Sequence, residues 1–109
     1  PLASGLLGKK IKIFLKNDHR SQWLNTNRLS KIYNSIDEIK KNYNYNITEL
    51  SVLFLKKSEF SKKVIFGCRT VSQFKNIEKI IYLKIKLSEK QFSNIKKMYL
   101  TNIKNKYLY

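Results

Sequence analysis

Acidic side chains and cysteine are both scarce in this chain of 109 residues. Only 7 aspartate and glutamate residues stand against 23 lysine and arginine residues, which gives a formal net charge of +16. Cys68 is the single cysteine, so the sequence excludes an internal disulfide framework and a thiolate cluster around a metal. We therefore expect neither a disulfide-stapled fold nor a metal site.

Long hydrophobic runs are also missing. Uncharged apolar stretches such as residues 51–55 are far shorter than the ~20 residues that a membrane-spanning helix needs. No signal peptide is visible, and we expect a cytoplasmic protein without a membrane partner. Because the chain opens on Pro1 in place of an initiator methionine, we also expect it to be the C-terminal portion of a larger protein.

The excess of positive charge has two explanations. A basic protein with aromatic side chains is typical of a small nucleic-acid-binding module, and this is the alternative function that the composition leaves open. However, the excess is nearly all lysine and accompanies 11 asparagines and 13 isoleucines, which an A/T-rich genome produces without any selected partner. The lysines are also spread along the chain. The composition therefore favours drift over a nucleic-acid partner.

Apolar spacing and capping residues predict four helices. Apolar residues recur every three or four positions over residues 28–43, which indicates an amphipathic helix. We expect Thr48 to cap a second helix that ends near Lys57. Capping-box patterns at residues 70–73 and 88–91 predict two further helices. Their inward faces would carry Phe74, Ile77 and Ile81 in the first, and Phe92, Ile95 and Tyr99 in the second.

Two short segments have the pattern of strands. Residues 64–66 form a continuous apolar run that ends at Gly67, which is typical of a strand buried on both faces of a parallel sheet. Residues 83–87 alternate between apolar and charged side chains, which suggests a half-buried strand. A buried strand needs hydrogen-bonding neighbours on both sides. We therefore expect most of the sheet to lie upstream of Pro1.

The turn at residues 67–70 is the candidate functional feature. It follows the predicted buried strand and precedes a capped helix, so free backbone N–H groups and the positive end of the helix would meet at one point. Arg69 adds a planar guanidinium that can hold a phosphate by two hydrogen bonds, and Gly67 lets a ligand approach the backbone. The alternative is a plain strand-to-helix connection with a solvated arginine.

Four segments, in order, resemble the aldo-keto reductase family. Residues 1–10 (PLASGLLGKK) resemble the loop after the seventh barrel strand, and residues 46–55 (NITELSVLFL) resemble the seventh helix. Residues 64–74 (VIFGCRTVSQF) are similar to the eighth strand and the start of its helix, and residues 87–99 (LSEKQFSNIKKMY) to the C-terminal helix. The resemblance implies an α/β fold, the C-terminal quarter of a (β/α)8 TIM barrel, over residues 1–100. Residues 101–109 would form a basic, disordered tail.

The resemblance also implies a function, which is to bind the cofactor NADP in an aldo/keto reductase that transfers hydride between NADPH and a small carbonyl substrate. NAD is the alternative cofactor. The catalytic Asp, Tyr, Lys and His of the family map onto no residue of this chain, so its partner would be the remainder of the barrel. An inactive, truncated remnant is a further alternative. The implied cofactor-binding residues are Pro1, Leu2, Ala3, Ser4, Lys9, Arg20, Gly67, Arg69, Gln73 and Asn76.

Overall fold

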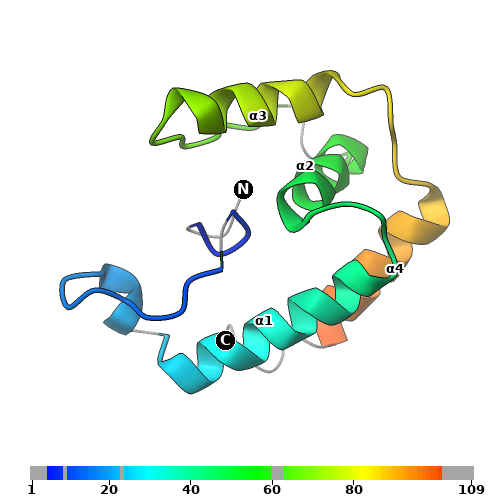
Figure 1. Ribbon diagram of the computed structural model, residues 1–109. Coiled ribbons are helices and arrows are strands. Elements are labelled where there is room, and N and C mark those ends of the chain that lie inside the picture. Colours follow the sequence, from blue (N-terminus) through cyan, green and yellow to red (C-terminus); the bar gives the residue numbers. More distant parts are fainter. Residues whose placement is uncertain (1–4, 9, 23, 60–62, 102–109) are drawn as a thin grey trace.

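The computed structural model describes residues 5–8, 10–22, 24–59 and 63–101 of the chain. In this part the chain forms a short 3-10 helix, η2 (His19–Gln22), and four α-helices. These are α1 (Thr26–Lys41), α2 (Ile47–Lys57), α3 (Val71–Tyr82) and α4 (Glu89–Tyr99). In Figure 1, α1 runs along the bottom of the molecule and α3 along the top, with α2 between them.

Helix α1 is the base on which the main core is built. The side chain of Asn25 accepts a hydrogen bond from the backbone N–H of Arg28 and caps the start of the helix. Its apolar residues repeat at helical spacing and form one buried stripe. The main core consists of Leu6, Leu24, Leu29, Ile32, Tyr33, Ile36, Ile39, Leu50, Leu53, Leu87 and Ile95.

Helices α2 and α4 pack against α1 and against each other. A capping box between Asn46 and Glu49 begins α2, so the cap is Asn46 and the prediction of Thr48 was wrong. The rings of Phe54 on α2 and Phe92 on α4 stack with centroids 4.6 Å apart. A capping box that begins at Ser88 starts α4, as the sequence predicted. Helices α1, α2 and α4 therefore share one core.

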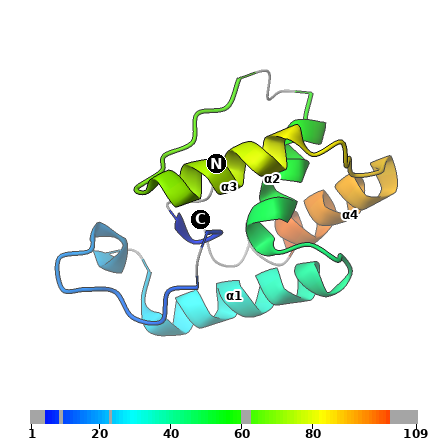
Figure 2. The same cartoon turned by 45° about the horizontal axis from the view of Figure 1, so that its top comes forward.

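Helix α3 lies apart from that core and packs on α2 (Figure 2). Its buried side chains are Ile77 and Ile80, and neither belongs to the main core cluster. The ammonium group of Lys56, at the end of α2, donates hydrogen bonds to the carbonyl oxygens of Ile81 and Leu83, each 2.7 Å long. Because the last carbonyls of a helix lack partners within the helix, Lys56 both caps α3 and ties it to α2.

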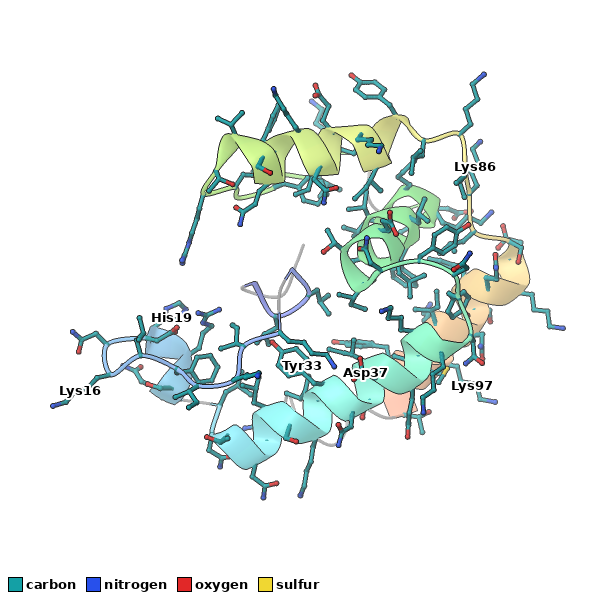
Figure 3. The ribbon with its side chains drawn as sticks, viewed as in Figure 1. Lys16, His19, Tyr33, Asp37, Lys86 and Lys97 are labelled. Atoms are coloured by element: carbon teal, nitrogen blue, oxygen red, sulfur yellow. The ribbon has the colours of Figure 1, made fainter. Side chains whose placement is uncertain are left out.

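The segment that precedes η2 is held on α1 and α2 by polar contacts. The Tyr33 hydroxyl accepts a hydrogen bond of 2.9 Å from the backbone N–H of Ile11. Lys10 forms an ion pair of 2.5 Å with Asp37, and both Tyr33 and Asp37 are seen on α1 in Figure 3. The Thr48 hydroxyl donates to the carbonyl oxygen of Leu7. Thr48 therefore anchors the opening loop instead of capping α2.

The structure contradicts the expected α/β fold. Within the described ranges there is no β-strand or sheet, so the prediction of a (β/α)8 TIM barrel quarter was wrong. Residues 63–68 have no regular secondary structure and pair with no other segment there, and Ile65 is 89% exposed. Residues 83–87 form an unpaired connection whose last residue, Leu87, enters the helical core. A strand requires a hydrogen-bonded neighbour. Neither the apolar run at residues 64–66 nor the alternation at residues 83–87 can supply that neighbour by itself.

The structure describes four α-helices, whose lengths range from 11 to 16 residues. None of them combines the length and the apolar character that a bilayer crossing requires.

Candidate phosphate-binding turn

The turn at the start of α3 is ordered by its own side chains. Thr70 has extended backbone angles, and its hydroxyl accepts a hydrogen bond from the backbone N–H of Gln73, as the sequence predicted. The side-chain oxygen of Gln73 accepts a bond of 2.8 Å from the backbone N–H of Arg69. The second bond therefore reaches one residue beyond the cap, to Arg69 rather than to Thr70. It fixes the backbone of Arg69 relative to the helix.

Gly67 and Arg69 both face open space. A Cβ atom built on Gly67 would meet no atom within 4 Å, and the positive φ found at Gly5 does not occur at Gly67. Gly67 is thus not required for the turn conformation. Arg69 is exposed, and its side chain forms no ion pair with any residue that the structure describes. The guanidinium is therefore available to an external anion.

Gln73 and Asn76 lie on the exposed side of α3. They are three residues apart, so their side chains are neighbours on the helix surface. The next residue, Ile77, is 6% exposed and faces α2. The structure therefore joins Arg69 to Gln73 by a hydrogen bond and places Asn76 about one turn further along α3, while Gly67 precedes the turn and faces open space.

Arg20 belongs to a different part of the molecule. Its guanidinium donates to both carboxylate oxygens of Asp18, at 2.8 and 2.5 Å, and lies 5.2 Å from the ring centroid of Phe14. These hydrogen bonds hold the pKa of Asp18 well below its ordinary value and raise the pKa of Arg20. A Cβ on Gly5 would lie 3.3 Å from one guanidinium nitrogen, so Arg20 does lie beside the opening loop. Its role over a pyrophosphate stays a prediction.

The remaining predicted cofactor-binding residues lie outside the described residues. They are Pro1, Leu2, Ala3, Ser4 and Lys9, and the predicted tail lies almost wholly outside them as well. The opening loop can be followed from Gly5, where φ is +89° and glycine is required.

The sequence analysis did not single out a second group of basic side chains, which lies at the other end of α3. Lys56, Lys57 and Lys86 line one cavity there, together with Leu53 and Leu87. Lys56 and Lys57 stand at the end of a predicted helix, and lysines at that position are typical partners of helix carbonyl groups. The addition of Lys86 depends on tertiary packing. In the described part of the chain, no three histidine, cysteine or acidic side chains gather as a metal site would require.

Comparison with protein-family models, with curated proteins and with solved structures finds no match to this chain. The fold is that of a small helical protein over the residues described. The resemblance to aldo-keto reductases therefore stays a prediction that rests on the quoted sequence segments.

Proposed function

We propose that this chain binds the adenosine 2′-phosphate of NADP at the turn before α3 and serves as the cofactor-binding part of an NADP-dependent oxidoreductase. The observation that carries the proposal is the exposed guanidinium of Arg69, which forms no ion pair with the described residues, next to an ordered helix N-terminus. The resemblance to the aldo-keto reductases supplies the identity of the cofactor. The α/β barrel of that family is not part of the proposal.

The turn offers several donors to one phosphate group. The cap already occupies the backbone N–H groups of Arg69 and Gln73, but those of Val71 and Ser72 have no partner within the helix, and the helix dipole places a partial positive charge beside them. Arg69 can add two parallel hydrogen bonds to phosphate oxygens. Since the Gln73 side-chain oxygen already accepts from Arg69, its NH2 group remains free to donate. The donors thus match the acceptor-only character of a phosphate.

Cofactor choice follows from the same contact. NAD carries a ribose hydroxyl where NADP carries the 2′-phosphate, so a guanidinium at this point favours NADP by charge and by hydrogen-bond number. The chain would thereby position the adenosine half of the cofactor. Hydride transfer to a carbonyl substrate would require acid and base groups that we assign to no residue of this chain.

A titration with fragments of the cofactor tests the proposal. Adenosine 2′,5′-bisphosphate and adenosine 5′-monophosphate are added to the ¹⁵N-labelled chain, and affinities are taken from amide shifts. We expect weak binding that is tighter for the bisphosphate. Arg69→Ala removes a charge-assisted contact worth about 1.5–3 kcal/mol, so the bisphosphate should bind at least about tenfold more weakly. Lys79→Ala, which removes a charge from the last turn of α3, is the matched control.

Two results would contradict the proposal. One is equal affinity for the two nucleotides; the other is equal weakening by Arg69→Ala and Lys79→Ala. Gly67→Ala provides a second check, because the added Cβ enters open space and should leave stability unchanged while it narrows the approach to the turn. Tight, salt-sensitive binding of DNA or RNA would instead favour the nucleic-acid-binding alternative.

A further inference from the structure

A cavity of about 180 Å³ lies at the end of α3 that is remote from Arg69. It is lined by Leu53, Lys56 and Lys57 of α2 and by Lys86 and Leu87 of the segment that leads into α4. Leu53 and Leu87 are 1% and 2% exposed, so they form an apolar floor. Lys86 is seen in Figure 3 on the connection between α3 and α4. The side chains of three lysines therefore line one small space.

The charges around this cavity are not balanced. Lys57 is paired with Glu89, the first residue of α4. Lys56 uses two of its three N–H bonds on the carbonyl oxygens of Ile81 and Leu83. Those carbonyls are neutral, so its charge is not cancelled. Lys86 forms no ion pair with the residues described. The site thus keeps an excess of positive charge beside the two buried leucines.

The size of the cavity limits the ligand. Sites for whole cofactors or drug-sized molecules occupy about 300–1,000 Å³, and this cavity is smaller. It suits one anionic group. Phosphate fits best, because its several oxygens can accept hydrogen bonds from more than one ammonium group at once.

We propose that Lys56, Lys57 and Lys86 form a binding site for a single phosphate group. The site is separate from the turn at Arg69, because α3 has 12 residues and is therefore about 18 Å long. One phosphate cannot contact both ends. The two sites can consequently be tested independently, and the loss of one leaves the other in place.

Phosphate titration of the ¹⁵N-labelled chain, at constant ionic strength, tests this site. We expect saturable shifts of the amides of Lys57, Lys86 and Leu87. Lys86→Gln should weaken binding about tenfold, the effect of one charge-assisted hydrogen bond. Lys84→Gln removes the same charge from an exposed neighbour that does not line the cavity, and should leave the affinity unchanged. Lys56 is not used as the variant, because it also caps α3.

Two results would overturn the proposed phosphate site. One is equal weakening of phosphate binding by Lys84→Gln and Lys86→Gln, and the other is amide shifts that do not saturate. A parallel titration with glycerol 3-phosphate identifies the source of the group, since tighter binding than inorganic phosphate indicates an esterified ligand that contacts the apolar floor. Arg69→Ala should leave phosphate binding at Lys86 unchanged. This last arm separates failure of the cavity site from failure of the proposed NADP contact.

Discussion

The ion pair between Asp18 and Arg20 makes the stability of the N-terminal segment depend on pH. Both side chains are mostly covered, with 16% and 14% of their surfaces exposed. The hydrogen bonds from Arg20 lower the pKa of the Asp18 carboxyl in the folded state. A group with a lowered folded pKa stabilises the fold above its unfolded pKa, which is about 3.9 for aspartate. That contribution is lost as the pH falls below about 4.

We predict that Asp18→Asn is destabilising near neutral pH and has a shrinking effect in acid. The free energy of unfolding of both proteins, measured by urea denaturation at a series of pH values, checks this. The difference should be constant above about pH 5 and should decline as the pH falls below about 4, because the unfolded wild-type chain then binds a proton at Asp18 while the folded chain, with its lowered pKa, does not. A difference that grew in acid would refute the assignment.

At the scale of elements, α3 is the one described α-helix that contributes no residue to the main core. Its predicted inward face included Phe74 and Ile81, which are 56% and 41% exposed, because the buried stripe of the helix is formed by Ile77 and Ile80 alone. A helix that packs on only one neighbour buries a narrow stripe. Local opening of α3 should therefore cost less free energy than opening of α1.

We predict that Ile80→Ala and Ile65→Ala have very different effects. Ile80 is 2% exposed, and its truncation should cost about 2–5 kcal/mol of the stability of α3. Ile65 is 89% exposed, and its truncation should change stability by less than about 0.5 kcal/mol. Hydrogen exchange would show faster exchange in α3 for Ile80→Ala. A large loss of stability in Ile65→Ala would indicate that residues 64–66 form a buried strand after all.

The sequence predicted the helices better than the strands. Helix positions follow from contacts within one segment, so apolar spacing placed α1 within two residues and caps placed the starts of α3 and α4. The cap of α2 was missed although Asn46 and Glu49 have capping-box spacing. Strands depend on distant partners, so residues 64–66 could not be assigned from local hydrophobicity. The same reason explains which candidate site could be predicted. The turn at Arg69 depends on neighbouring residues in the sequence, whereas Lys86 and Lys56 line one cavity only because of tertiary packing.

At the scale of the whole molecule, the net charge of +16 complicates every measurement of anion binding. The described part of the chain extends over 40 × 34 × 25 Å. The Debye length is about 30 Å at 0.01 M salt, so in dilute buffer an anion is attracted by lysines over much of the surface. At about 0.15 M salt that length falls to about 8 Å, and binding reports on local contacts. Specific phosphate recognition must therefore persist at the higher salt.

The most direct measurement is an amide shift map of the whole chain during titration with NADPH and, separately, with NADH at about 0.15 M salt. Our account predicts that NADPH shifts concentrate at residues 67–73 and saturate. It also predicts that NADH produces much weaker shifts there, because it lacks the phosphate that Arg69 would hold. Equal shifts for the two cofactors, or shifts spread over the lysine-bearing faces of all four helices, would contradict the account.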